Sequence, residues 1–259
     1  MFYITSQGKN LSILKSKAGV VASLPGIDLQ DNYYYLRNWT VSAFEKWGLN
    51  GNADGFTDNE LAKSYKTFHD PDNGNSSMVC LNHVAYSRND SMGENLHPKY
   101  VPEKYIELIM AIDRDRERYI RPDLERDIKS GRVTDTSMGC MAEFSVCTVC
   151  GNIAYEEHDR CEHLDNKYGS RKGDMVTSSL GNHVLCGELY FNVDFVENSI
   201  IDDGAGADMN AKIFEIAAHK EGKKVATKDS VYYAVKQLKR THGNLKIFKK
   251  IEDAIDRKN

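Results

Sequence analysis

Short apolar runs separated by polar turns dominate the chain, and most of them have the length of β-strands. Met78-Val-Cys-Leu81 is one such run and predicts a buried strand. Tyr105–Asp113 fits a strand or a helix by its pattern, and we favour a strand. Met141–Val146 alternates in polarity, and Val184–Val196 has the composition of a strand interrupted by Gly187.

Helical patterns are fewer and have recognisable ends. Thr57-Asp-Asn-Glu60 has the spacing of a capping box, which predicts a helix over about 58–68. Pro122–Ser130 reads as a helix that Gly131 stops. After Gly206 the pattern becomes helical over about 209–220, 229–240 and 245–256. We place a domain edge near residue 222, since Gly222 can end a helix and Asp229 can cap the next one.

Composition is that of an ordinary globular protein. The chain has 259 residues, of which 41% are hydrophobic and 28% charged. Its apolar runs are shorter than the roughly 20 residues that span a bilayer. The first residues, Met-Phe-Tyr-Ile-Thr-Ser, lack a basic leader with an apolar core. We therefore expect a protein that acts in a cytoplasm and has no membrane partner.

The charges are divided unevenly along the chain. Residues 211–259 hold 13 Lys and Arg against 6 Asp and Glu, a local charge of +7, and the preceding 210 residues carry −11. A basic tail on an acidic body predicts either a docking element for an anionic partner or a solvated helical surface.

The six cysteines suggest a metal site. Cys147-Thr-Val-Cys150 followed by Cys161-Glu-His163 has the spacing of four ligands around one tetrahedral ion. In a reducing compartment such clustering favours a metal over disulfides. Thiolate and imidazole ligands suit a structural Zn²⁺, with iron as a lesser alternative. His163 is our choice for the fourth ligand, and His158 and Cys186 are its rivals.

Two further residues are candidates for catalysis. Ser137 lies in Asp135-Thr-Ser-Met-Gly139, where we expect a turn that leaves its hydroxyl exposed beside backbone N–H groups. His83 follows the apolar run 78–81. A Ser-x-Gly motif or a lone histidine is by itself far more often structural than catalytic. Ser137 and His83 become candidates for catalysis only through the order of features along the whole chain.

That order resembles the prohead maturation proteases of tailed bacteriophages, which are relatives of the herpesvirus assemblins. Their pattern is an Asn-His that ends a strand, an apolar strand, a helix ending in Gly, a Ser-x-Gly segment and a Val-Asp-x-Val strand. The corresponding segments here are Asn82-His83, Tyr105–Asp113, Ile128–Gly131, Thr136–Gly139 and Val193–Val196. A subgroup looks similar also in an upstream Asn- and Gly-rich segment (Gly51–Phe56) and in a Cys-x-x-Cys-Gly knuckle (Cys147–Gly151). The resemblance covers roughly residues 48–211.

The resemblance implies an α+β fold with an assemblin-like, mainly antiparallel β core or barrel flanked by helices. A catalytic domain would span residues 1–221, with a zinc knuckle at 145–165 inserted in it, and a basic helical tail would span 222–259. Ser137 would be the nucleophile, His83 the general base and Asp194 the orienting acid, with Glu197 as a rival. In a regular strand Asp194 and Glu197 point to opposite faces, so only one of them should serve.

The implied activity is that of a serine endopeptidase which cleaves scaffold and major capsid proteins, and possibly itself, inside a phage prohead in the host cytoplasm. One alternative is a catalytically inactive, zinc-braced virion or scaffold component of the same fold. A second is a zinc-dependent nucleic-acid-binding module, which the acidic body disfavours. A third, Cys140 as a thiol nucleophile, lacks a histidine at a readable spacing, and we expect that cysteine to be structural.

Overall fold

The computed structural model describes residues 19–21, 24, 26–70, 75–84, 88–165, 169–178, 180–202 and 206–218. The chain divides into two compact units, Met1–His219 and Lys220–Asn259. The second unit lies outside the described residues, so the basic tail at 222–259 and the helices expected over 229–240 and 245–256 do too. Among the described residues, no helix combines the length and apolarity that crossing a membrane requires.

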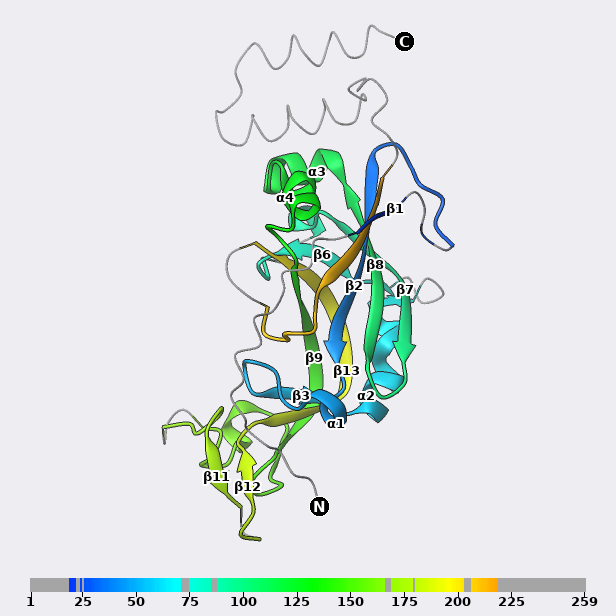
Figure 1. Ribbon diagram of the computed structural model, residues 1–259. Helices are drawn as coiled ribbons and strands as arrows, with labels where there is room; N and C mark the ends of the chain where they lie inside the picture. The colour runs from blue at the N-terminus through cyan, green and yellow to red at the C-terminus, as the bar shows by residue number, and fades with distance from the viewer. Residues whose placement is uncertain are drawn as a thin grey trace, which may run out of the picture. The chain divides into compact units, whose positions relative to one another are not determined.

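A mixed sheet of ten strands forms most of the first unit (Figure 1). Its continuous order is β1-β14-β2-β8-β7-β6-β13-β9-β10, and β3 pairs with one end of β13. The strands are β1 (Gly19–Val21), β14 (Ile213–Ala218), β2 (Tyr33–Ser42), β8 (Tyr105–Asp113), β7 (Gly93–Val101), β6 (Met78–Leu81), β13 (Glu188–Ile201), β9 (Asp135–Cys147), β10 (Ile153–Ala154) and β3 (Asp54–Phe56). Most pairs are antiparallel, while β1/β14, β3/β13 and β6/β13 are parallel. The expected mixed fold, mainly of strands, is confirmed.

The sheet does not close into a barrel, so that part of the expectation is wrong. Strand β9 meets the start of β14 at an isolated bridge between Asp135 and Lys212. Two backbone hydrogen bonds adjoin this bridge, from the Thr136 N–H to Ala211 O and from the Ile213 N–H to Thr134 O. Two two-stranded sheets complete the strands: β11 (Met175–Thr177) with β12 (His183–Leu185), and β4 (His69–Asp70) with β5 (Asn75–Ser76).

The helices are short and lie at the ends and edges of the sheet. They are α1 (Phe44–Trp47), α2 (Asp58–Ser64), α3 (Arg114–Ile120) and α4 (Leu124–Ser130), with 3-10 turns at Tyr65–Phe68 (η1), Arg88–Asp90 (η3) and Glu157–Asp159 (η4). Thr57 caps α2 by accepting a bond from Glu60 N at 3.2 Å, as the capping-box spacing predicts. Gly131 ends α4 in the left-handed conformation that its position requires.

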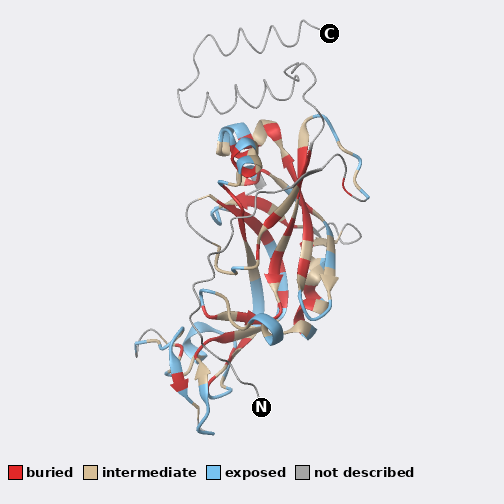
Figure 2. Cartoon of the chain, in the orientation of Figure 1, coloured by how far each residue is buried: buried red, intermediate tan, exposed pale blue. Residues whose placement is uncertain are grey.

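The core lies between the curved faces of the sheet and under α3 and α4 (Figure 2). One cluster of buried side chains lies under α4 and includes Leu124, Ile128 and Ile200. A second cluster, at the other end of the sheet, includes Leu61, Phe68 and Phe195. The rings of Phe68 and Phe195 stack at 4.3 Å. This second cluster anchors α2 and η1 against β13.

Helix α2 and turn η1 also cover the part of β13 that lies between its partners β3 and β6. The Val193 N–H donates to Glu60 Oε1 at 2.9 Å, and the Phe195 N–H donates to Thr67 Oγ1 at the same distance. Side chains thus satisfy backbone groups that a neighbouring strand would otherwise pair. Strand β13 is in this way held along its length.

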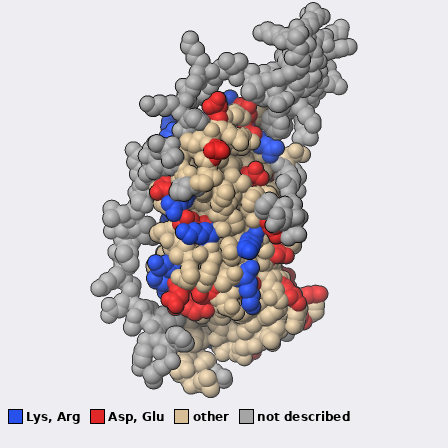
Figure 3. All heavy atoms as spheres, turned by 90° about the vertical axis from the view of Figure 1, so that its right-hand side faces the viewer, with Lys and Arg blue, Asp and Glu red and all other residues tan. Residues whose placement is uncertain are grey.

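One expected helix is a strand. Residues 213–218 of the expected helix 209–220 form β14, which pairs with both β1 and β2. On the face of the molecule shown in Figure 3, acidic and basic side chains are interspersed.

Candidate active site and metal centre

His83 lies in a tight turn directly after β6. Asn82 and His83 both have positive φ, 48° and 61°, and the Val84 N–H closes the turn on Leu81 O at 2.9 Å. Two consecutive residues other than glycine in this region are uncommon and cost backbone energy. Asn82 compensates by donating its N–H to Ile200 O at 3.1 Å and accepting the Asp202 N–H on its side chain at 3.0 Å. The turn therefore fixes His83 over the end of β13.

Glu197 meets His83 there. The Nδ1 atom of His83 lies 2.7 Å from Glu197 Oε1, and the Glu197 side chain is 5% exposed against 46% for His83. The hydrogen bond with Glu197 raises the pKa of His83, and partial burial of the ring opposes this shift only in part. Because Nδ1 is engaged by the carboxylate, Nε2 is the ring nitrogen that can exchange a proton with a substrate.

Ser199 holds both members of this pair. Its hydroxyl donates to Glu197 Oε2 at 2.5 Å and accepts the backbone N–H of His83 at 3.1 Å. The side chain is completely buried. Each carboxylate oxygen of Glu197 is thus engaged, and a buried carboxylate needs such partners to remain charged.

Ser137 lies across the β9/β13 ladder from Ser199. The two serines are directly paired in the antiparallel register, and paired residues point to the same face. Ser199 is buried, whereas Ser137 is partly exposed and lines a cavity together with His83. Ser137 lies within β9, which starts at Asp135, so the turn expected over 135–139 is a strand.

A β-bulge in β13 sets the directions in which the side chains of Asp194 and Glu197 point. The register shifts between Phe195 and Glu197, so Asp194 pairs with Met141 and Glu197 with Gly139. Because those partners are two residues apart, both acids point to the same face, contrary to the alternation expected in a regular strand. Asp194 is exposed beside α2, in a different hollow, and Glu197 contacts His83. The structure therefore places the rival acid, not our first choice, beside the histidine.

Gly139 makes room for this arrangement. A Cβ atom built on Gly139 would overlap Glu197 Oε1, the oxygen that contacts His83. The glycine of the Ser-x-Gly motif therefore leaves space for the Glu197 carboxylate on the neighbouring strand.

The cavity beside Ser137 has a volume of about 510 Å³ and continues well beyond Ser137 and His83. One wall is the segment 47–56, which comprises the end of α1, a loop and β3; the others include β2, residues 207–210 and Tyr190. Cys140 also lines it, packed against the second core cluster. Burial raises the pKa of Cys140 to about 12, which keeps its thiol neutral and argues against a nucleophilic role.

The cysteines and histidine chosen from the sequence lie together. One ligand atom from each of Cys147, Cys150, Cys161 and His163 falls within 4.8 Å of all the others. The Sγ atoms of Cys150 and Cys161 are 3.4 Å apart, and Cys161 Sγ lies 3.6 Å from His163 Nδ1. Ligands around a tetrahedral ion bonded at about 2.3 Å are separated by roughly 3.8 Å. The cluster could therefore hold a metal ion.

The two rival ligands are not members of this group of four. His158 is exposed and pairs with Glu156 at 3.2 Å and Asp159 at 3.4 Å. Cys186 is buried and its thiol donates to the His163 carbonyl at 3.4 Å, so it supports the backbone of the cluster.

We call residues 147–186, which carry the cluster, β10, η4, β11 and β12, the Cys–His module. A small apolar cluster, which includes Val149, Leu164 and Val176, lies beside the ligands. The module does not adjoin Ser137, because ten residues of extended strand, roughly 30 Å, separate Ser137 from Cys147. The Cys-x-x-Cys-Gly segment, which closely follows Ser137 in the sequence, is therefore far from it along the strand.

Sequence reasoning missed two contributors to the site. Ser199 could have been found from its spacing, since Glu197 and Ser199 are two residues apart and share one face of a strand. The part played by Gly139 depends on cross-strand pairing, for which the sequence carries no local signal. Comparison of the chain with protein-family models, with curated proteins and with solved structures gave no match.

Proposed function

We propose that this chain is a serine endopeptidase that cleaves scaffold and capsid proteins during maturation of a phage head. The contact between His83 and the buried Glu197, in the cavity that Ser137 lines, is the observation that carries the proposal. Ser137, His83 and Glu197 would then supply the hydroxyl, the base and the orienting acid that acyl transfer by serine requires.

In this proposal Ser137 Oγ attacks the scissile carbonyl while His83 Nε2 takes its proton. Glu197 keeps the imidazole in the tautomer with a proton on Nδ1 and stabilises its charged form. His83 then returns the proton to the leaving amine, and water releases the acyl group from Ser137 in a second round. Substrate is proposed to lie extended along β9, because the cavity follows Ser137, Met138 and Cys140 of that strand.

The test is covalent labelling of the purified chain with a small fluorophosphonate. We expect one modification, at Ser137, which Ser137→Ala abolishes and His83→Ala slows by at least about a hundredfold. Ser130→Ala, at the end of α4, is the matched control and should label at the parental rate. A folded chain whose Ser137 does not react would contradict the enzyme and favour the inactive, metal-braced structural protein.

The biological substrates are part of the same proposal. The scaffold and major capsid proteins would meet the enzyme inside the prohead, where confinement gives a high local concentration and modest intrinsic activity suffices. Mass spectrometry of capsid proteins from phage carrying Ser137→Ala, beside the parent, tests this assignment. Identical capsid termini in the two samples would refute it. Self-cleavage would appear in the same spectra as a shortened form of the chain.

We also propose that the metal is Zn²⁺ with a structural role. Three thiolates and one imidazole fill a tetrahedral site and leave no position open for substrate, and this ligand set suits zinc better than harder ions.

A further inference from the structure

Besides the catalytic residues, the first unit contains a buried ionic network at the junction of the Cys–His module and the main sheet. At its centre is Glu188, the first residue of β13, whose side chain is 1% exposed. Arg160 donates to both Glu188 oxygens, from Nε at 2.9 Å and from Nη2 at 3.1 Å, and Lys172 Nζ donates at 2.9 Å. Ser145 and Tyr190 donate hydroxyl bonds of 3.0 Å each.

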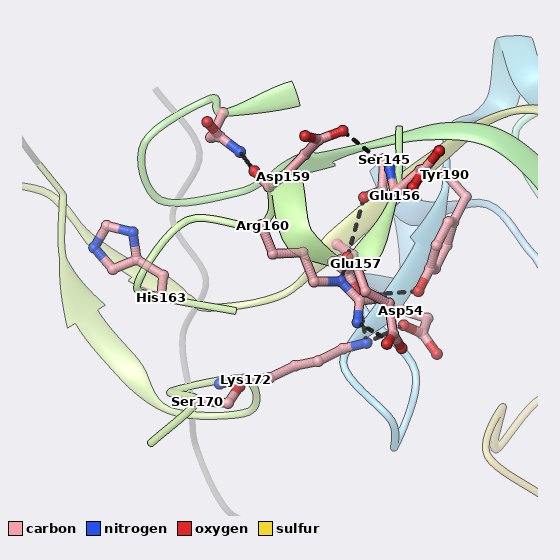
Figure 4. A network of polar contacts seen from close by, with 12 residues as sticks. Asp54, Ser145, Glu156, Glu157, Asp159, Arg160, His163, Ser170, Lys172 and Tyr190 are labelled. Atoms are coloured by element: carbon pink, nitrogen blue, oxygen red, sulfur yellow. Dashed lines mark hydrogen bonds and ion pairs between the residues drawn. The ribbon is translucent and has the colours of Figure 1, made fainter. Parts of the chain in front are cut away.

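Both cations of this network belong to the module. Arg160 directly precedes the cluster residue Cys161, and Lys172 lies between the cluster and β11. Figure 4 shows the two side chains extending from the module toward Asp54 and Tyr190. Burial opposes the ionisation of Glu188, yet the bond from Lys172 and the charges of both cations hold its pKa below the usual range. The buried charge of β13 is thus compensated by residues of the module.

Lys172 extends the network to the cavity. Its Nζ also donates to Asp54 Oδ1 at 2.6 Å, so it links the first residue of β3 to the first residue of β13. These two residues are paired in the sheet, and the Glu188 N–H donates to Ala53 O at 3.0 Å. Asp54 and Tyr190 both line the cavity beside Ser137.

The segment 47–56 is also held by the pairing of β3 with β13 and by Phe56, which is buried in the second core cluster. The Asp54 N–H donates within the segment to Asn50 Oδ1 at 3.0 Å, and the Gly51 N–H donates to Ala207 O at 2.7 Å, which is also in the cavity wall. The pair of Lys172 and Asp54 is therefore the salt bridge among the described residues that ties this wall to the module.

We propose that Lys172 and Arg160 are positioning residues through which metal binding in the Cys–His module fixes the 47–56 wall of the peptide groove. Ordering of the module by the metal places both cations: Lys172 bridges Asp54 of β3 and Glu188 of β13, and Arg160 fixes the Glu188 carboxylate that Lys172 binds. The metal therefore governs how firmly an extended substrate is bound and leaves the chemistry at Ser137, His83 and Glu197 unaffected. This inference rests on the proposed peptidase function for its substrate, but its structural core can be tested without any substrate.

The first experiment is hydrogen exchange on the full chain, followed by mass spectrometry of fragments covering residues 47–56. Removal of the metal by a chelator, verified by elemental analysis, should speed exchange in this segment as well as in the module. Lys172→Met should speed exchange in 47–56 while metal content stays unchanged. Lys129→Met is the matched control, since Lys129 forms an equally short pair with Glu125 on α4, 2.6 Å. Unchanged exchange in 47–56 after metal removal would overturn the proposal.

The second experiment separates binding from chemistry with two probes. For fluorescently labelled casein, which needs an extended groove, Lys172→Met should raise KM at least about fivefold with kcat within about twofold. For the small fluorophosphonate the rate of labelling should stay within about twofold. Equal losses for both probes would overturn the proposal. If the parental chain neither cleaves casein nor labels, the peptidase assignment fails, and the exchange experiment still decides whether the module fixes the wall.

Discussion

At the scale of single residues, the site depends on how one buried carboxylate is held. Glu197 shares its two oxygens between the imidazole of His83 and the hydroxyl of Ser199. The same hydroxyl accepts the His83 backbone N–H, so base and acid are aligned by one buried group. A carboxylate in this position both orients the ring and favours its charged form.

This arrangement predicts the pH dependence of the reaction. The general base must be neutral, and Glu197 raises the pKa of His83 above its ordinary value near 6.5. Activity should therefore fall, as pH decreases, at a higher pH than for an unperturbed histidine. In Glu197→Gln the acid limb should move to lower pH and the maximal rate should drop by about a hundredfold or more. The measurement is the pH profile of fluorophosphonate labelling.

Asp194→Asn removes the same charge from the same face of β13 and is the control for that experiment. We expect it to keep the parental profile and rate. A profile that moves in Asp194→Asn but not in Glu197→Gln would return the orienting role to Asp194.

The sequence predicts some of these residues and not others, for physical reasons. The candidate metal ligands Cys147, Cys150, Cys161 and His163 are close in sequence, so their spacing alone predicts that they lie together. His83 was singled out only by a family-like order of motifs. The motif order favours Asp194, which lies in the Val-Asp-x-Val segment, and a period of two places Glu197 on the opposite face; the bulge after Phe195 breaks that period.

At the scale of elements, a second bulge explains the strand that was expected to be a helix. In β14 the register shifts between Ile213 and Glu215, so Ile213 pairs with Asn38 and Ile216 with Leu36. Residues three apart thereby point to the same face, and both isoleucines are buried. This spacing imitates a helical face. Strand β8 has no extra residue of its own within its ladders, and its bounds, Tyr105–Asp113, are those predicted from the sequence.

The close contact of β9 and β13 at Gly139 gives a prediction at this scale. Gly139→Ala should push the Glu197 carboxylate away from His83, because the new methyl group would occupy the position of Oε1. We expect labelling of Ser137 to slow by about tenfold to a hundredfold with folding retained. Met141→Ala, an exposed position on the same strand, is the control and should behave as the parent. Parental labelling by a folded Gly139→Ala protein would show that the carboxylate can move without loss.

At the scale of the whole first unit, the sheet carries the candidate catalytic residues and the Cys–His module carries the candidate metal ligands. The sheet brings His83, Ser137 and Glu197 into one region. The module binds to the sheet through Arg160, which contacts Glu188, and Lys172, which contacts Asp54. A polar segment such as 151–160 contributes little apolar surface of its own, so a bound ion would supply much of its folding energy.

Metal content can be predicted at this scale. Elemental analysis of the purified chain should find about one zinc per molecule, bound through three thiolates and one imidazole. Cys161→Ser and His163→Ala should lose the metal and melt at a lower temperature. His158→Ala and Cys186→Ser remove the rival ligands and should retain it. Retention of zinc by His163→Ala together with its loss from His158→Ala would reassign the fourth ligand.

The position of β13 between β6 and β9 has a consequence for the timing of activity. The strands that lead to the histidine and carry the serine are synthesised first, and the strand that joins them, with the acid, is synthesised afterwards. While β13 is still inside the ribosome, β6 and β9 have no strand between them that could hold His83 and Ser137 in register. For the proposed peptidase, competence would therefore arise on insertion of a single late strand, and a chain that lacks this strand would not cleave its neighbours.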